Sequence, residues 1–299
     1  MLINKKEKIV VKIEGGLGNQ MFQYAFGMSI ALKYNAILVL DISYYNNNEC
    51  HNGFELSDVF LLDSKVSVRK KFQGGFLASN RYLVKVIDFI GIRKYLLPCH
   101  FFEQLYRFND ILSPECANNY YTGFWQNELY FSDIRNKILD DFSFKRSLSV
   151  KNMELLNKVK NSNSVAIQVR RGDYVSNKST NEFHGTCEVN YFYDAIEVIK
   201  KENSNIEIYI FSDDIDWAKN NIFFNSISYF INLNKGNEAY LDMLLMSNCK
   251  HVVISNSSFG WWAAWINKNP FGVVVAPKRW FNSLTIDTSD LCPKTWHRV

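Results

Sequence analysis

Three clusters of polar residues in the second half of the chain have side chains suited to binding anions and nucleosides. They are Arg170 with Arg171, Asp213 with Asp214, and the run Ser255, Asn256, Ser257 and Ser258. Two arginines offer fixed donors for bidentate binding of a phosphate. A carboxylate accepts hydrogen bonds from ribose hydroxyls or a base, and hydroxyls with free N–H groups at a helix start bind anions. Together these residue types fit a sugar nucleotide diphosphate.

Each cluster lies at the end of a predicted strand. The apolar runs 164–169, 206–211 and 251–255 have the pattern of buried strands, and helical patterns alternate with them. This alternation predicts a parallel, doubly wound sheet, whose ligands bind at the carboxyl ends of the strands. Taken alone, each serine-rich or acidic cluster is more often a helix N-cap than a ligand. Their coincidence on one edge favours a binding site.

The first half opens with another strand, glycine turn, helix and strand. Gly16 and Gly18 follow the first strand and Asp41 ends the second, which imitates a dinucleotide-binding fingerprint. Met21 stands where the third glycine belongs, and its bulk opposes close packing of helix on strand. A nicotinamide-dependent oxidoreductase is therefore the weaker alternative. The following region, 46–119, is irregular and predicts helices and long loops.

Two further patterns suggest metal or thiol chemistry, and both signals are weak. Asp214 and Asp216 have D-x-D spacing, but the helical pattern after them favours carboxylates that complement a helix dipole. His184 and Cys187 lack a second ligand pair nearby. The tryptophans of the helix predicted at 259–268 are expected to be core rather than a sugar platform.

Composition and charge exclude other classes. The 299 residues are 47% hydrophobic, which excludes a disordered chain, and the net charge of +4 is mild for a nucleic-acid binder. The basic run 69–71 fits a solvated face or an anionic membrane surface. No apolar run approaches the ~20 residues of a membrane helix, and the charged start is not a secretory signal. The six scattered cysteines are therefore expected to be reduced cytosolic thiols.

Six stretches of the sequence together resemble the α-1,2-fucosyltransferases of glycosyltransferase family 11. They are Gly15–Tyr24, Val165–Tyr174, His184–Cys187 with Tyr191, Phe211–Asp214, Ile254–Trp265 and Pro277–Phe281. They follow the family's order across nearly the whole chain. The region 46–119 carries no matching motif, and we expect acceptor choice to lie there.

The resemblance implies a GT-B-like α/β fold with two Rossmann-like halves. Residues 1–150 would form the acceptor side and residues 151–299 the GDP-fucose-binding side. It implies inverting transfer of L-fucose to O2 of a terminal galactoside, without metal or other cofactor. It also implies a cytoplasmic protein at the inner face of the plasma membrane, acting on a lipid-linked acceptor in O-antigen or other surface polysaccharide assembly. A non-catalytic nucleotide-sugar-binding protein remains a further alternative.

The resemblance also implies roles for the polar clusters. Arg170 would contact the donor pyrophosphate with Arg171 in support, and Asp213 or Asp214 would face the nucleoside. The hydroxyl run 255–258 would cap the phosphates. From the first half, the donor would be reached by Asn19 and Gln20.

The catalytic base is left open by the sequence. Asp173 is the first candidate, with His184 and Glu14 behind it, although Asp173 fits equally well as a brace for the arginines. Gln168 stands where the family usually has His. Glutamine forms hydrogen bonds but does not titrate, so we expect this position to orient groups rather than carry a proton.

Overall fold

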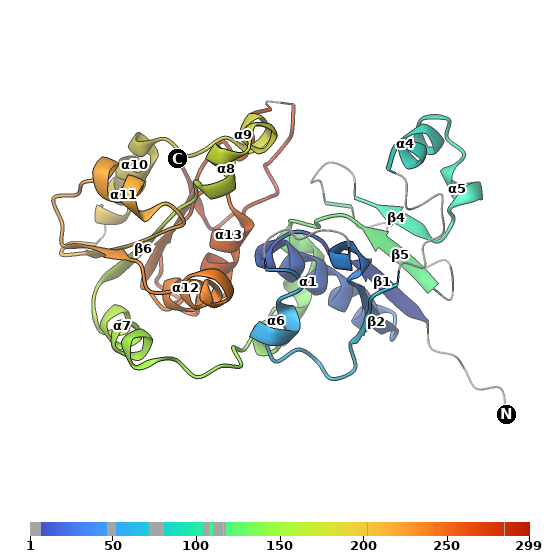
Figure 1. Cartoon of the computed structure of the whole chain (residues 1–299), viewed down its shortest axis with the longest axis horizontal. Coiled ribbons are helices and arrows are strands. Elements are labelled where there is room, and N and C mark those ends of the chain that lie inside the picture. Colours follow the sequence, from blue (N-terminus) through green and yellow to red (C-terminus); the bar gives the residue numbers. More distant parts are fainter. Residues whose placement is uncertain are drawn as a thin grey trace. The chain divides into compact units, whose positions relative to one another are not determined.

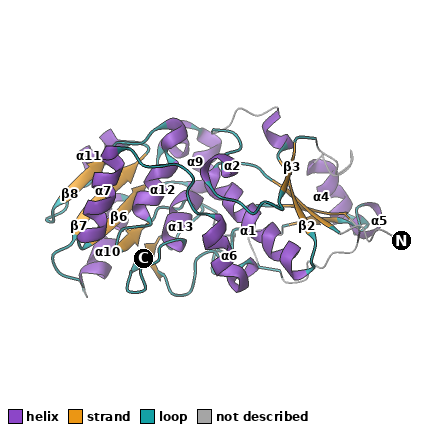
Figure 2. Cartoon of the chain, turned by 90° about the horizontal axis from the view of Figure 1, so that it is seen from below, coloured by secondary structure: helices purple, strands orange, loops and turns teal. Residues whose placement is uncertain are grey.

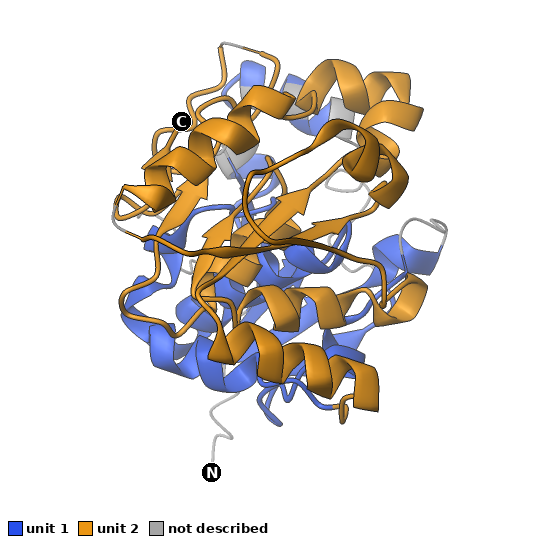
Figure 3. Ribbon diagram, turned by 90° about the vertical axis from the view of Figure 1, so that its left-hand side faces the viewer, with its two compact units in different colours: residues 1–145 blue, residues 146–299 orange. Residues whose placement is uncertain are grey.

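Two parallel sheets, each with its own helices, organise the chain. In the computed structural model the chain divides into two compact units, Met1–Lys145 and Arg146–Val299, which Figure 3 colours separately. The structure describes residues 7–46, 52–71, 81–103, 108–109, 116, 118–201, 203–283 and 285–299. Across these ranges, no helix combines the length and the apolar character needed to cross a bilayer.

The described part of the first unit forms a parallel sheet in the order β3-β2-β1-β5-β4 (Figure 1). Its strands are β1 (Lys8–Lys12), β2 (Ile37–Asp41), β3 (Ser67–Arg69), β4 (His100–Phe102) and β5 (Asn118–Thr122). Its helices are α1 (Leu17–Lys33), α2 (Leu56–Val59), α4 (Arg81–Phe89), α5 (Arg93–Leu96) and α6 (Arg135–Asp141), with 3-10 helices η1 (Ser43–Asn46), η2 (Glu128–Tyr130) and η3 (Ser132–Ile134). The predicted opening unit of strand, helix and strand is confirmed.

Helix α1 packs very closely on this sheet at Gly27. A Cβ atom there would lie 2.7 Å from side-chain atoms of both Val11 and Leu38, so the approach requires glycine. Met21, at the place of the third fingerprint glycine, is instead a fully buried core residue. The close approach of helix and strand thus lies about two helical turns beyond the glycine turn. In a dinucleotide-binding site this approach would lie at the start of the helix, beside the bound pyrophosphate.

The region 46–119 contributes more strand than its pattern predicts. β3, β4 and the first residues of β5 lie in it, where the sequence predicts helices and long loops. Strands of three residues carry no readable alternation. Pairing of β3 with β2 and of β4 with β5 defines them instead.

A disulfide in the first unit corrects the expectation of six reduced thiols. Cys99 precedes β4 and Cys116 precedes the neighbouring β5, and their Cα atoms lie 5.7 Å apart. Two cysteines separated by 17 positions give no sign of this pairing in the sequence, because it depends on strand order. Cys187, Cys249 and Cys292 are free thiols, and Cys50 lies outside the described residues.

The described part of the second unit forms a parallel sheet in the order β11-β10-β9-β6-β7-β8, which confirms the predicted doubly wound arrangement. Its strands are β6 (Ser164–Val169), β7 (Glu207–Ser212), β8 (Ser228–Ile231), β9 (His251–Val253), β10 (Val274–Ala276) and β11 (His297–Arg298). Its helices are α7 (Val150–Asn161), α8 (Gly172–Ser176), α9 (Lys178–His184), α10 (Val189–Lys200), α11 (Ile215–Asn221), α12 (Tyr240–Met246) and α13 (Ser258–Trp265), with the 3-10 helix η4 (Gly236–Glu238).

The central strand β6 directs alternate side chains to opposite faces of the sheet. Val165, Ile167 and Val169 pack in an apolar core with residues of α10 and α11. The side chain of Gln168 lies on the other face, against α13. Figure 2 shows these helices around the strands. The tryptophans of α13 are buried, which confirms them as core.

Candidate functional site

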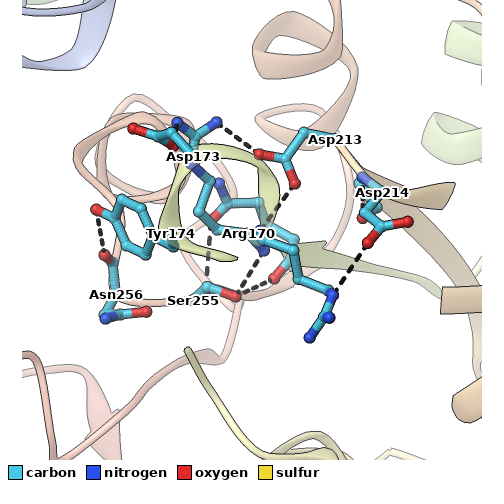
Figure 4. Close-up of polar contacts among 10 residues, drawn as sticks. Arg170, Asp173, Tyr174, Asp213, Asp214, Ser255 and Asn256 are labelled. Atoms are coloured by element: carbon cyan, nitrogen blue, oxygen red, sulfur yellow. Dashed lines mark hydrogen bonds and ion pairs between the residues drawn. The ribbon is translucent and has the colours of Figure 1, made fainter. Parts of the chain in front are cut away.

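Arg170 lies directly after β6, between two carboxylates. Its Nη2 atom is 2.5 Å from Asp173 Oδ1, and its Nη1 atom is 2.7 Å from Asp213 Oδ2 (Figure 4). The Arg170 side chain remains 27% exposed. Charge-assisted contacts to two sides fix the orientation of a guanidinium group. Arg170 is therefore oriented in advance and still accessible to an anion.

Arg171 is held by the acidic pair that follows β7. Its backbone N–H donates to Asp213 Oδ1 (2.8 Å), and its Nε donates to Asp214 Oδ2 (3.1 Å). Its guanidinium lies 3.8 Å from the ring centroid of Trp217. Asp213 thus contacts both arginines, and Gly172 makes room for it, since a Cβ atom there would lie 2.6 Å from Asp213 Oδ2.

Asp214 also begins α11, as the helical pattern predicts. Its Oδ1 accepts from the backbone N–H of Trp217 (3.2 Å), which is an N-cap contact. With both oxygens used, Asp214 is a poor partner for Asp216 in a D-x-D metal site. No group of three or more His, Cys, Asp or Glu side chains arranged for a metal ion occurs among the residues the structure describes.

Ser255 joins the ends of β6 and β9. Its hydroxyl donates to the carbonyl of Gln168 (2.7 Å) and accepts from the backbone N–H of Arg170 (3.2 Å). Its own N–H donates to Gln168 Oε1 (3.3 Å). The residue is fully buried. Ser255 therefore holds the backbone from Gln168 to Arg170 in place, and with it the start of the arginine pair.

Gln168 is accommodated by a glycine in the first turn of α13. A Cβ atom at Gly260 would lie 2.2 Å from Gln168 Oε1 and 2.8 Å from its Cδ. No real Cβ atom approaches that closely, so a larger residue at 260 would have to displace the amide. Sequence reasoning singled out Gln168 and missed Gly260, because the contact joins residues that are distant in the chain.

Asn256 connects the start of α13 to two other segments. Its Nδ2 donates to the backbone carbonyls of His184 (3.0 Å) and Trp280 (3.1 Å). The backbone carbonyl of Asn256 accepts from the hydroxyl of Tyr174 (3.2 Å). The side chain is buried. Ser257 and Ser258 differ from Asn256, because within the described ranges neither hydroxyl forms a side-chain hydrogen bond. Ser257 is the N-cap residue of α13, but its side chain does not cap the helix.

His184 lies in an aromatic cluster close to the arginines. Its ring stacks on Tyr174 at a centroid distance of 4.6 Å, and Arg170 lies 5.3 Å from the centroid of the Tyr174 ring. Burial lowers the pKa of His184, while the charge of Asp173 raises it and that of Arg170 lowers it further. His184 is therefore a neutral imidazole at neutral pH. Its buried Nδ1 has no hydrogen-bond partner in the described structure.

Cys187 has none of the features of a reactive thiol. Burial raises its pKa to about 11, so the thiolate is scarce at neutral pH. Its Sγ lies 3.7 Å from Asn256 Oδ1. The structure gives no support to a thiol nucleophile at this position.

Asn19 and Gln20 lie at the start of α1 in the first unit. Gln20 is fully buried; its Nε2 donates to the carbonyls of Gly15 (3.1 Å) and Gly53 (2.8 Å), and its Oε1 accepts from Glu55 N–H (2.9 Å). Asn19 Oδ1 accepts from Gln126 Nε2 (2.8 Å). The Gln20 side chain thus ties the glycine turn to a loop.

Sequence reasoning missed an acidic residue with unusual electrostatics. Burial raises the pKa of Asp242 in α12 to about 7, although a hydrogen bond from Asn234 (2.7 Å) opposes the rise. Asn234 also exchanges side-chain hydrogen bonds with Asn152 of α7 (2.8 and 3.1 Å). Asn234 lies three positions after β8, at the carboxyl edge of the sheet. The sequence did contain a signal for this site, because Asp242 is the one charged residue in the apolar segment Tyr240–Met246.

Comparison with solved structures shows that this fold is GT-B-like. The structure of the NodZ alpha-1,6-fucosyltransferase soaked with GDP-fucose matches with a TM-score of 0.52 at 14% identity, covering 88% of this chain and 93% of that chain. NodZ from Bradyrhizobium, in a further crystal structure, matches with a TM-score of 0.51. These matches define the fold class, a GT-B-like α/β fold.

The chain belongs to glycosyltransferase family 11, whose family model matches residues 8–298. It is 36% identical to an Alpha-1,2-colitosyltransferase of Escherichia coli, over 97% of this chain and 98% of that protein. It is 30% identical to the O-antigen biosynthesis glycosyltransferase WbnK of Escherichia coli, over 92% of this chain and 97% of that protein. The resemblance read from the sequence is confirmed, and the oxidoreductase alternative is set aside.

Proposed function

We propose that this glycosyltransferase transfers L-fucose from GDP-fucose, with inversion, to O2 of a terminal galactoside. The observation that carries the proposal is Arg170, held between Asp173 and Asp213 at a strand end and still accessible to an anion. The α-1,2 linkage is supported by the Escherichia coli Alpha-1,2-colitosyltransferase, and the donor by family membership. A surface polysaccharide acceptor is supported by the relative in O-antigen biosynthesis.

A colitosyl donor is the second candidate. The relative that transfers colitose is 36% identical over almost the whole of both chains. Colitose is fucose without the 3-hydroxyl group, so a single sugar contact would separate the two donors. A site that hydrogen-bonds this hydroxyl would discriminate strongly against the sugar lacking it.

In the proposed mechanism the second unit binds the donor and the first unit binds the acceptor. Transfer passes through an oxocarbenium-like state, and negative charge grows on the β-phosphate of the GDP leaving group. Arg170, supported by Arg171, stabilises that charge, together with the N–H groups and hydroxyls at the start of α13. Asp213 and Asp214 were expected to face the nucleoside, but their carboxylates contact Arg170 and Arg171, so we assign them to holding the arginines in place. The mechanism requires no metal.

Three residues are candidates for the base towards the acceptor hydroxyl: Asp173, His184 and, in the first unit, Glu14. Asp173 is 42% exposed, but its Oδ1 is paired with Arg170, which favours it as a brace. His184 is neutral because burial lowers its pKa. If His184 is the base, kcat falls as the pH drops through its pKa, below the usual 6.5, and His184→Asn removes that limb. If the acid limb persists unchanged in His184→Asn, His184 is not the base and the role falls to Asp173 or Glu14.

The acceptor and location follow from the same proposal. We infer a galactose-terminated oligosaccharide, lipid-linked, and a cytoplasmic enzyme at the inner membrane face. The region 46–119 and the rest of the first unit would select the acceptor. These assignments extend to this chain the role in O-antigen biosynthesis of its relative WbnK.

One assay tests the proposed reaction. The protein is incubated with GDP-fucose or GDP-colitose and lactose, in the presence of EDTA, and the products are analysed by mass spectrometry and NMR. Fucosyllactose with an α-1,2 linkage is the expected product. A product from GDP-colitose only would establish the second donor. Loss of activity in EDTA would contradict the metal-free mechanism, and GDP binding without transfer to any galactoside would indicate a non-catalytic binding protein.

A further inference from the structure

The hairpin formed by α4 and α5 exposes an unusual number of apolar side chains. In Figure 1 the two helices lie beside β4, the edge strand of the first sheet. Among the side chains of the hairpin that the structure describes, the exposed apolar ones are Val86, Phe89, Ile90, Ile92, Tyr95 and Leu96. Phe89 is 93% exposed and Tyr95 is 71% exposed. Contiguous exposed apolar patches mark binding surfaces, whereas single exposed apolar residues need no explanation.

The hairpin has already buried one apolar face. Val84, Ile87 and Leu97 form a buried cluster, against which Phe102 of β4 packs. Surface helices normally present polar side chains on the face opposite the core. On the opposite side, Val86 and Phe89 of α4 and Ile90 directly after it are exposed at the i, i+3, i+4 spacing of one helix face. This second face is available to an external partner.

The turn between the helices is formed at Gly91, between two exposed isoleucines. Gly91 has φ +77°, a conformation that favours glycine, and it ends α4 between Ile90 and Ile92. A Cβ atom at Gly91 would meet nothing within 4 Å. The backbone at Gly91 is therefore uncovered by neighbouring side chains, and the residues on both sides of it, Ile90 and Ile92, are exposed.

The charge of the segment indicates which partner fits. Between residues 81 and 96 the sequence has four basic residues, Arg81, Lys85, Arg93 and Lys94, and one acidic residue, Asp88. An apolar surface combined with basic residues is the pattern of a segment that lies in the interface of an anionic membrane. A symmetric dimer through this hairpin would instead bring two copies of the same basic segment together.

We propose that the α4–α5 hairpin docks the protein on an anionic lipid membrane. Phe89, Ile90 and Ile92 would insert at the headgroup boundary, and the basic content of the segment would add electrostatic attraction. α4 has nine residues, so the hairpin lies in the interface and does not cross the bilayer. Docking of this kind is independent of the donor and of the reaction proposed above.

Vesicle co-sedimentation of the full chain tests the docking surface. We expect the protein to pellet with vesicles of phosphatidylethanolamine and phosphatidylglycerol, and much less with phosphatidylcholine alone. The double substitution Phe89→Glu with Ile90→Glu should weaken binding by at least about tenfold, and raised salt should weaken binding of the parent chain. Phe271→Glu is the matched control, since Phe271 is 83% exposed in the second unit, and it should bind as the parent does.

Three results would overturn membrane docking by the hairpin. They are a parent chain that stays in the supernatant with anionic vesicles, a Phe89→Glu, Ile90→Glu variant that pellets like the parent, and a dimer that the variant dissociates without any vesicle binding. Both substituted side chains are exposed, so the melting temperature should be unchanged. Transfer activity with soluble lactose should also be unchanged, which separates failure of docking from failure of the proposed reaction.

Discussion

Gln168 and Gly260 fit each other so closely that neither position is independent of the other. The Gln168 amide accepts from Ser255 N–H, and Gly260 leaves the space it occupies. A histidine at 168 would titrate near neutral pH, whereas glutamine keeps the same hydrogen-bonding state at all relevant pH values. Gln168 is therefore a positioning residue for the Ser255 backbone, as the sequence predicts.

Gly260→Ala should destabilise the protein by about 1–3 kcal/mol, because the added Cβ overlaps the Gln168 amide. In a Gln168→Ala background the overlapping atoms are absent, and the same substitution should cost much less. A double-mutant cycle by urea unfolding measures this coupling. Gly27→Ala, a crowded glycine in the first unit, is the control and should cost the same in both backgrounds. An equal cost of Gly260→Ala with and without Gln168 would refute the pairing.

The polar clusters could be read from the sequence because each follows a strand, and parallel strands bring their carboxyl ends to one edge. Arg170, Asp213 and Ser255 indeed contact one another or share a partner. The sequence could not show that the side chains of Ser255 and Asn256 form hydrogen bonds with the backbone of neighbouring segments. Those partners are set by tertiary packing, which no local pattern records.

Asp242 of α12 destabilises the folded chain when its carboxyl group is ionised, because the group is buried. Burial raises its pKa to about 7, well above the ordinary value of 3.8. Between these two values the folded chain retains a proton that the unfolded chain has released. Stability therefore falls as the pH rises through this window.

Asp242→Asn should remove this pH dependence and raise the melting temperature at about pH 8 by at least about 2 °C. Asparagine keeps an oxygen that can accept from Asn234 and has no charge to bury. Thermal unfolding followed by circular dichroism across the pH window measures the change. Glu154→Gln, on an exposed face of α7, is the control. A melting temperature that depends on pH as steeply in Asp242→Asn as in the parent would contradict the raised pKa.

The strands of the second unit from β6 to β10 were predictable from their apolar runs, whereas β3 and β4 of the first unit were not. The strands at 164–169 and 206–211 correspond to β6 and β7 within one residue at each end. The three-residue β3 and β4 have no pattern of their own and exist by pairing with neighbours. The helices α8 and α9 have five and seven residues and are mostly polar. Their sequences therefore show no helical repeat of apolar residues from which they could be predicted.

At the scale of the whole molecule, each unit has its own sheet and core, so their stabilities should be separable. The Cys99–Cys116 disulfide lies wholly in the first unit. Reducing it should destabilise that unit by about 3 kcal/mol, the loss expected for a loop of this length. Affinity for GDP, which we assign to the second unit, should remain the same. Calorimetric unfolding with and without reductant, compared with Cys99→Ser, measures the effect, and an unchanged first transition would contradict it.

The most direct measurement is the affinity of the protein for GDP with and without the Arg170 guanidinium. Titration calorimetry should show GDP binding to the parent chain, a loss of about 10²-fold or more in Arg170→Ala, and partial retention in Arg170→Lys, which keeps charge but not the planar fork. Lys178→Ala, on the exposed face of α9, should bind GDP normally. Undiminished GDP affinity in Arg170→Ala, in a folded protein, would contradict the assignment of this site to the donor diphosphate.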